Sequence, residues 1–176
     1  MNRRVALRPL QEGDRTRFIE RARASESLHR SWVSPPKDAE GFDALLEHSR
    51  AADARTYVVV LFEDGSLAGV FNLSHIVRGR LQSAYLGYFA FVPHAGRGHM
   101  SEGMVLLLRE IFVGLRLHRV EANVQPQNVA SLALVRRAGF RKEGFSPRYL
   151  KIAGRWRDHE RWALTVEDWR AARSRR

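Results

Sequence analysis

The first half of the chain breaks into short apolar runs separated by turn residues, a pattern typical of antiparallel strands. The first run alternates apolar and polar positions, and the next is rich in β-branched and aromatic residues. After it, Asp64-Gly65 is a strong hairpin signal, which predicts that the following run returns beside it. The four strands predicted in this half cover residues 5–10, 57–62, 67–76 and 83–92.

Helical patterns interrupt and then follow these strands. Asp14 is placed to cap a helix through residues 18–22, and residues 42–48 repeat the pattern. From 104 to 115 apolar residues recur every three or four positions, which predicts one buried helix face. The remaining predicted elements are a buried strand over 118–124, a helix over 131–137 closed by Gly139, and two strands within 149–164 that turn at Ala153-Gly154. This order predicts an α/β (α+β) fold, with helices covering a mixed sheet.

The composition limits the class of protein. At 176 residues the chain fits a single domain, residues 1–176, with a core that needs no disulfide or metal. The absence of cysteine excludes thiol catalysis, Cys-based zinc sites and disulfides. No apolar run approaches a membrane span, and the N-terminus lacks the apolar core of a signal peptide. We therefore expect a soluble cytoplasmic protein with no membrane partner.

The charge balance is strongly basic, at a formal net charge of +11, and nearly all of the basic residues are arginine. Arginine suits phosphate recognition, so the imbalance favours an anionic ligand or an RNA-rich neighbour, although a genomic preference for arginine codons explains it equally well. The charges are spread along the chain, apart from a short basic C-terminal tail over 170–176 with Arg173, Arg175 and Arg176. Such a tail predicts at most weak, non-specific binding to nucleic acid.

The stretch "FVPHAGRGHMSEGM", residues 91–104, carries the first candidate chemistry. A strand passes into a helix through Gly96 and Gly98, which would direct unpaired backbone N–H groups at one point. A pyrophosphate fits there, and so does an ordinary turn. The spacing does not match a Walker loop, and the third glycine of a dinucleotide fingerprint is missing.

The downstream segment separates these alternatives. "EANVQPQNVASLALVRRAGFRKEG", residues 121–144, contains Asn-x-x-Ser-x-x-Leu at the start of a helix and Ala-Gly-Phe-x-x-Glu-Gly at its end. Together with the Gly-x-Gly loop, this resembles the GNAT N-acetyltransferases, and most closely the RimJ/RimL-type ribosomal-protein-alanine acetyltransferases. The segments "FNLSHIVRG", "AYLGY", "HRVEAN" and "YLKIAGRWRDH" extend the resemblance from about residue 32 to residue 169.

The resemblance implies a central, mostly antiparallel sheet that splays open, with acetyl-CoA as co-substrate and no metal. Acetyl-CoA would lie between the strands 85–92 and 118–124, with its pantetheine along the exposed edge of the first strand. Its pyrophosphate would lie on backbone amides at the start of the helix, near Ser101. The implied coenzyme-binding residues are Phe89, Phe91, Val92, Gly96, Arg97, Gly98, His99, Met100, Ser101 and Asn128.

Two positions depart from the family pattern. Ala95 replaces the Gln or Arg that usually begins the loop, but backbone amides do most of the phosphate binding. Val135 stands where many members carry the tyrosine that protonates the departing thiolate. RimL-like enzymes give that role to a serine, which corresponds to Ser131 here; the alternative is a serine without a catalytic role. We also expect a backbone amide near Phe91 or Val92 to stabilise the oxyanion.

The general base, which takes the proton of the acceptor amine, is less clearly indicated by the sequence than the general acid. Glu121 and Asn123 share one strand face and would reach the amine if that face is the open cleft, whereas Glu121 could equally pair with an arginine. The glutamate proposed as base in RimL corresponds to Leu150. An α-amine with a pKa of about 7.7–8.0 is roughly a tenth to a fifth neutral near pH 7, so it demands little of its base.

The sequence leaves several candidates for the molecule that accepts the acetyl group. The leading hypothesis is the N-terminal α-amine of a protein, such as a ribosomal protein or one on the ribosome, with Trp32 and Tyr88 either lining the peptide channel or simply packing. A small-amine acetyltransferase is the alternative, and a non-catalytic acetyl-CoA or RNA-binding module is a third. His94 and His99 are expected to be surface histidines beside the phosphates. The enzyme is expected to be a monomer or a homodimer.

Overall fold

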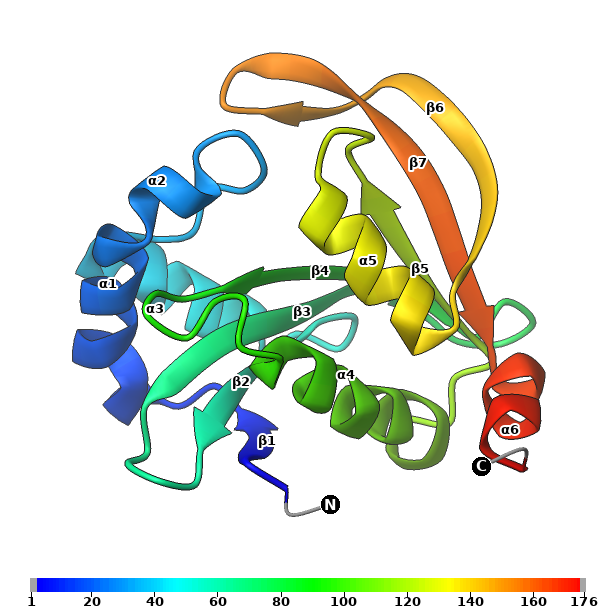
Figure 1. Ribbon diagram of the computed structural model, residues 1–176, viewed down its shortest axis with the longest axis horizontal. Helices are drawn as coiled ribbons and strands as arrows, with labels where there is room; N and C mark the ends of the chain where they lie inside the picture. Colours follow the sequence, from blue (N-terminus) through cyan, green and yellow to red (C-terminus); the bar gives the residue numbers. More distant parts are fainter. Residues whose placement is uncertain (1–2, 175–176) are drawn as a thin grey trace.

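A twisted sheet forms the centre of the computed structural model, which describes residues 3–174 (Figure 1). Across this part of the chain seven strands lie in the order β1-β2-β3-β4-β5-β7-β6. Only the β4–β5 pair is parallel, which confirms the predicted mixed, mostly antiparallel sheet. The strands are β1 (Val5–Pro9), β2 (Arg55–Leu61), β3 (Leu67–Val77), β4 (Ser83–Ala90), β5 (Arg119–Val124), β6 (Arg141–Ile152) and β7 (Arg155–Thr165).

The sheet opens between its two parallel strands. β4 and β5 are in register at only three positions, the last of which joins Tyr85 to Glu121. Beyond that point β4 continues to Ala90 and β5 to Val124, and Figure 1 shows these free ends diverging. The predicted splay between β4 and β5 is therefore present in the structure.

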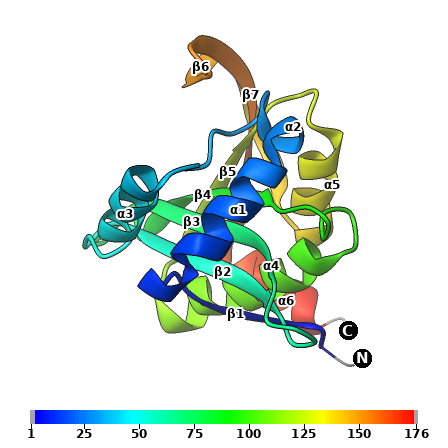
Figure 2. The ribbon, with the colours of Figure 1, turned by 90° about the vertical axis from the view of Figure 1, so that its left-hand side faces the viewer.

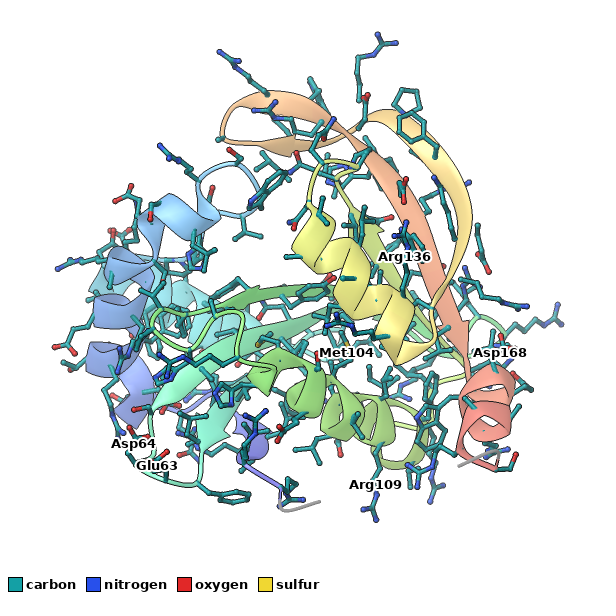
Figure 3. All side chains as sticks on the ribbon, in the orientation of Figure 1. Glu63, Asp64, Met104, Arg109, Arg136 and Asp168 are labelled. Atoms are coloured by element: carbon teal, nitrogen blue, oxygen red, sulfur yellow. The ribbon has the colours of Figure 1, made fainter. Side chains whose placement is uncertain are left out.

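Helices cover both faces of the sheet (Figure 2). On one face α1 and α3 pack over an aromatic cluster around Phe18 and Phe42, and on the other α4 and α5 cover the larger core. Met104 points from α4 into that core and is almost fully buried, whereas Arg109 projects outward (Figure 3). The helices are the short Glu12–Asp14 turn, α1 (Arg15–Ala24), α2 (Glu26–His29), α3 (Ala39–His48), α4 (His99–Arg109), which continues as a π-helix over Glu110–Gly114, α5 (Val129–Ala138) and α6 (Val166–Ser174).

Most predicted elements occur, with shifted ends. β4 stops at Ala90 because the next residues turn: the amides of His94 and Ala95 both donate to the Phe91 carbonyl. α4 begins two residues earlier than predicted, at His99. Gly139 ends α5 with a φ of 94°, as predicted for a left-handed C-terminal residue.

Two helices were not predicted. α2 has only four residues, too few for any periodicity to register. α6 includes residues 170–174 of the predicted basic tail, whereas Arg175 and Arg176 lie outside the described residues. Within residues 3–174, none of the helices combines the length and apolarity that crossing a membrane requires.

Candidate functional site

The loop between β4 and α4 presents backbone donors that the protein does not use. The amides of Arg97 and Ser101 are engaged, donating to the carbonyls of His94 (3.4 Å) and Gly98 (3.0 Å). Four others have no acceptor among residues 3–174, namely the amides of Gly96, Gly98, His99 and Met100. Arg97 and Ser101 were expected to bind the coenzyme, but their amides are therefore not available to it. The remaining four lie at the N-terminus of α4, where the helix dipole favours an anion.

Glycine is required at two positions of this loop. Gly96 and Gly98 have φ values of 77° and 85°, in the left-handed region that other residues adopt at a cost. A Cβ at Gly96 would extend into open space, with no heavy atom within 4 Å. The amides therefore border a space that a ligand can enter, and this loop fits the pyrophosphate of a coenzyme.

Arg4, just before β1, adds positive charge that was not predicted from the sequence. Its Nη2 donates to the Arg97 carbonyl at 3.2 Å, and its Nε donates to Glu102 Oε1 at 2.6 Å. The Arg97 side chain is itself exposed beside the free amides. Arg4 and Arg97 are 93 residues apart, so no local motif could have joined them. Both can contribute charge to an anion at the loop.

His94 and His99 lie beside this loop, and the prediction that they are surface residues is wrong. Each is only 9% exposed, and their ring centroids are 6.0 Å apart. Nε2 of His94 and Nδ1 of His99 are buried without a partner in the described part of the chain. Burial lowers the pKa of both imidazoles, helped by Arg21 at His94 and by Arg4 at His99.

The end of β4 is already bonded, which corrects two predictions. The Phe91 amide donates to the Ala68 carbonyl on β3 at 2.9 Å, and the Val92 amide donates to Ser25 Oγ at 3.0 Å. Neither amide is therefore free to stabilise an oxyanion or to pair with pantetheine. The side chains of Phe89 and Phe91 are buried in the aromatic cluster with Phe18, away from the opening.

Since backbone groups two residues apart on a strand point the same way, Phe91 and Phe89 direct theirs toward β3. The edge of β4 that faces the splay therefore belongs to Tyr88 and Ala90. The Ala90 carbonyl there accepts a hydrogen bond of 2.7 Å from His29 Nε2. Any pantetheine that pairs with β4 would do so at these two residues.

Residues 25–33, which we call the strap, cross the open end of the splay. The strap bonds the end of β4 through Ser25 and His29, and its Ser31 carbonyl accepts from Gln125 Nε2, just past β5, at 2.9 Å. Trp32 lies in the turn after α2, its amide donating to the His29 carbonyl. Burial lowers the pKa of His29. The strap thus ties the two diverging strands together at their wide end.

α5 places Ser131 against Tyr88 of β4. Asn128 caps the helix, and its Oδ1 accepts from the Ser131 amide at 3.1 Å. Ser131 Oγ lies 2.5 Å from the Tyr88 hydroxyl, which is also 3.4 Å from the Ser131 carbonyl. Burial raises the pKa of Tyr88 to about 12. Ser131 is therefore fixed through both its backbone and its side chain.

Glu121 lies where β4 and β5 part, but it has an ionic partner. Its Oε1 accepts from Arg119 Nε at 2.8 Å, and Arg119 also binds Glu143 on β6. Arg119 holds the pKa of Glu143 below its usual range, through hydrogen bonding first. Asn123, two residues on, has a buried Oδ1 without a partner among the described residues. The pairing alternative for Glu121 is thus the one observed, and its Oε2 has no bond to residues 3–174.

The sequence-predicted residues fall on two faces of the sheet. Glu121 is in register with Tyr85, and Asn123 shares its face because side chains alternate along a strand. Tyr88, an odd number of residues from Tyr85, points to the other face, where it meets Ser131. The structure thus pairs Tyr88 with Ser131 and Glu121 with Asn123, and it separates Tyr88 from Asn123. The splay is the opening between the two pairs.

Within residues 3–174, no group of three or more His, Asp or Glu side chains is arranged to hold a metal ion. The arrangement offers instead an anion site at the loop, a hydroxyl pair on one face and a carboxylate on the other. These are the groups that acyl transfer from a nucleotide-bearing thioester would use.

Comparison with known proteins supports that interpretation. A probable N-acetyltransferase, YjcK of Bacillus subtilis, is 42% identical over 105 residues, which are 60% of this chain and 58% of that protein. The [ribosomal protein uS5]-alanine N-acetyltransferase of Escherichia coli is 40% identical over 111 residues, covering 63% of this chain and 57% of the relative. Each match therefore spans less than three fifths of the curated relative's length.

Solved structures share this fold. Mycobacterium smegmatis RimJ in complex with CoA-disulfide superposes with a TM-score of 0.84 at 28% identity, covering 93% of this chain and 83% of that one. A spermidine N-acetyltransferase from Vibrio cholerae in complex with CoA and spermine shares the fold, with a TM-score of 0.81 at 22% identity over 96% and 99% of the two chains. The acetyltransferase (GNAT) domain model matches residues 4–141, and the chain belongs to this GNAT acetyltransferase family.

Proposed function

We propose that this enzyme transfers the acetyl group of acetyl-CoA to the N-terminal α-amine of a protein, such as a ribosomal protein. The observation that carries the coenzyme half is the group of four amides at the start of α4 that have no acceptor within residues 3–174. They border open space at Gly96 and lie beside Arg4 and Arg97. Gly96, Gly98, His99 and Met100 would hold the pyrophosphate, with charge from the two arginines.

The two faces of the splay suit direct attack on a thioester. In that reaction the amine nitrogen bonds to the carbonyl carbon, the C–S bond breaks, and the sulfur keeps the electron pair. The amine loses a proton and the sulfur gains one. Glu121 and Ser131 stand on opposite faces of the opening, so an amine that approaches from the Glu121 face would expel the sulfur toward Ser131.

The choice of an α-amine rests on the weakness of the available base. Arg119 engages one oxygen of Glu121, which leaves Oε2 to take the amine proton through a water molecule. At pH 7 roughly a tenth to a fifth of α-amines are already neutral, compared with roughly one lysine side chain in 2,500. A base of this kind therefore serves an α-amine better than a lysine. The 40% identity to the uS5-alanine N-acetyltransferase supports the same acceptor class.

A small amine is the second candidate, favoured by the fold shared with the spermidine acetyltransferase. A polyamine is cationic and would need a carboxylate-rich pocket. On the Glu121 face the carboxylates of Glu121 and Glu143 are both engaged by Arg119, and the whole chain carries +11. These charges favour a peptide over a polyamine.

The acceptor is tested by measuring thiol release from acetyl-CoA with a panel of amines. The panel contains peptides with N-terminal alanine, the same peptides with a blocked α-amine and a free lysine, spermidine, and an aminoglycoside. We expect turnover with the free N-terminal peptides and none with the blocked ones. Acetylation of spermidine but of no peptide would overturn the proposal, and binding of acetyl-CoA without turnover would favour a binding module.

A further inference from the structure

We propose that Tyr88 is a positioning residue, which holds Ser131 so that the serine hydroxyl points its own proton at the departing sulfur. This inference rests on the proposed role of Ser131 as the proton donor to the coenzyme thiolate. Tyr88 comes from β4 and Ser131 from α5, so the contact also fixes the helix against the edge of the splay.

The direction of the hydrogen bond follows from the surroundings of the phenol. A phenol hydroxyl that is shielded from water needs an acceptor. Within the described chain, Tyr88 has two in reach: Ser131 Oγ at 2.5 Å and the Ser131 carbonyl at 3.4 Å. The carbonyl is the more distant, and it already belongs to the first turn of α5. Tyr88 therefore donates to Oγ, and burial keeps the phenol protonated by raising its pKa to about 12.

The hydrogen bond from Tyr88 limits where the hydroxyl proton of Ser131 can point. A serine hydroxyl has one proton and two lone pairs, and Tyr88 occupies one lone pair. The backbone of Ser131 is fixed by Asn128, so the hydroxyl proton is left for a third atom. Without Tyr88, the hydroxyl would be free to turn back to a carbonyl of its own helix, as serines near helix starts do. Tyr88 removes that competing rotamer.

The proton path balances with Tyr88 acting only as a hydrogen-bond donor. As the C–S bond breaks, its electron pair moves to sulfur, which takes the proton of Ser131. Tyr88 keeps its own proton, because burial raises its pKa to about 12, and its hydrogen bond stabilises the charge left on Oγ. Oγ regains a proton from water that enters the splay once the thiol has left, and that proton balances the one lost by the amine.

A double-mutant cycle of Tyr88→Phe and Ser131→Ala tests the proposal. Tyr88→Phe removes only the hydroxyl, and we expect kcat to fall about tenfold, the loss of one hydrogen bond in the transition state. Ser131→Ala should lower kcat on the order of 100-fold, within the usual range for a general acid. The double variant should be no slower than Ser131→Ala alone, because Tyr88 acts only through Ser131. Affinity for acetyl-CoA, measured by calorimetry, should stay within about twofold in all three.

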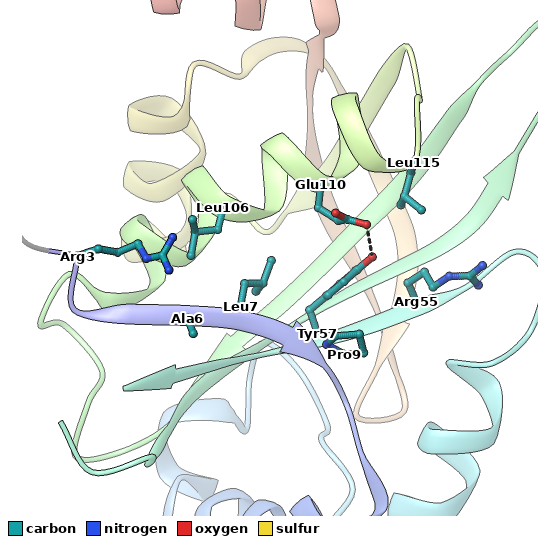
Figure 4. Close-up of a pocket in the computed structure, with 9 residues that line it drawn as sticks. All are labelled: Arg3, Ala6, Leu7, Pro9, Arg55, Tyr57, Leu106, Glu110 and Leu115. Carbon is teal, nitrogen blue, oxygen red and sulfur yellow. Dashed lines mark hydrogen bonds between the residues drawn. The ribbon is translucent and has the colours of Figure 1, made fainter. Parts of the chain in front are cut away.

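Tyr57 supplies the matched control. It lies on β2 beside a cavity of about 490 Å³ on the far side of α4, where its hydroxyl is 3.4 Å from Glu110 Oε1 (Figure 4). Its pKa is also raised to about 12, mainly by burial. Tyr57→Phe therefore removes a comparable phenol, two strands away from Tyr88, that bonds Glu110 and not Ser131, and kcat should not change. An equal fall in kcat for both phenylalanine variants would mark the effect as structural and contradict the proposal.

Two results overturn the inference. One is an unchanged kcat in Tyr88→Phe, and the other is a double variant whose loss is the product of the two single losses. The cycle is run with whichever amine the wild-type enzyme acetylates, or with water as acceptor if the panel gives none. A small-amine acceptor would thus contradict the proposed peptide substrate and still leave the Tyr88–Ser131 coupling measurable.

Discussion

The α4 loop and the Glu121 position stand at different ends of the same opening, and they differ in how the protein uses their polar groups. At the loop, four successive or near-successive positions carry amides without an acceptor in the described chain. At the point where β4 and β5 part, Glu121 is bonded to Arg119, which also binds Glu143. The first N–H groups of a helix have no acceptor within that helix, so those at the start of α4 are available to an anion.

The contrast shows why a coenzyme site is easier to identify than a base. An anion site consists of donors that remain unfilled until the anion arrives. A partly buried carboxylate commonly has ionic or hydrogen-bond partners in the free protein, and these partners look the same whether the role is structural or catalytic. The informative variants therefore change the charge at the loop and the ability of Glu121 to accept a proton.

Gly98→Asp should have the largest effect. Aspartate is a favoured N-cap residue and tolerates the left-handed region better than most residues, so α4 should form. Its carboxylate would occupy the free amides and repel a pyrophosphate, and acetyl-CoA affinity should fall on the order of 100-fold. Calorimetry measures the dissociation constant, and thermal unfolding shows whether the fold is kept.

Gly98→Asn is the control for shape. It has the size and backbone tolerance of aspartate without the charge, and should lose much less affinity. Because a Cβ at Gly98 would be 3.2 Å from Arg4 Nη2, both variants share the same steric cost. Equal affinities in the two variants would show that charge at this loop is irrelevant to the coenzyme.

Glu121→Gln should have an intermediate effect. Glutamine keeps the shape and can still contact Arg119, but it cannot accept a proton. We expect kcat/KM for an N-terminal peptide to fall about tenfold near pH 7, at the low end for a general base because part of the α-amine is already neutral. The loss should shrink as pH rises above the pKa of the amine. Initial rates of thiol release at several pH values measure this.

Glu143→Gln breaks the other half of the same ion pair. Glu143 shares Arg119 but lies on β6, so this variant should leave kcat/KM unchanged. If both variants lose activity equally, Glu121 supports the strand end and the base is another group. The pair of variants thus separates proton transfer from the loss of a salt bridge.

The sequence predicted the strands, most of the helices and the loop because each has a local signature, whereas the splay was expected from the family resemblance. Gly96 and Gly98 stand two apart before an apolar helical pattern, and Asn128 and Ser131 share one turn of α5. The contacts that escaped prediction join distant segments. Arg4 with Arg97, and Tyr88 with Ser131, are 93 and 43 residues apart, so only the folded chain brings them together.

The strap was also missed, for a physical reason. α2 is a single turn, and Ser25 and His29 bond backbone groups of Val92, just past β4, and of Ala90 at its end, which have no side-chain signature. Burial of His94 and His99 depended on how the loop folds back under Arg4 and Arg21, which their polar sequence context did not indicate. Strand alternation correctly placed Glu121 with Asn123, but it could not show that Arg119 would hold the carboxylate.

The smallest expected effect concerns these two histidines and the pH dependence of coenzyme binding. In the free protein their pKa values lie below the ordinary 6.5, first because of burial and then because of nearby arginines. A bound pyrophosphate offsets the arginine charge and raises both pKa values, so binding takes up protons. The charged and titratable groups around the pair are Arg4, Arg21, Asp64, Arg97 and Glu102.

Affinity should therefore increase as the pH falls toward and below 6.5, by about threefold between pH 7.5 and 6, since one group contributes at most tenfold for each pH unit of the window. Dephospho-coenzyme A is the probe, because it lacks the terminal phosphate whose own second pKa is about 6. Calorimetry in buffers of different ionisation enthalpy counts the protons. His94→Gln with His99→Gln should abolish the uptake, whereas His48→Gln, at an exposed position ending α3, should leave it intact. A dissociation constant that does not change with pH would show that the anion lies away from these histidines, and that the free amides of α4 act without them.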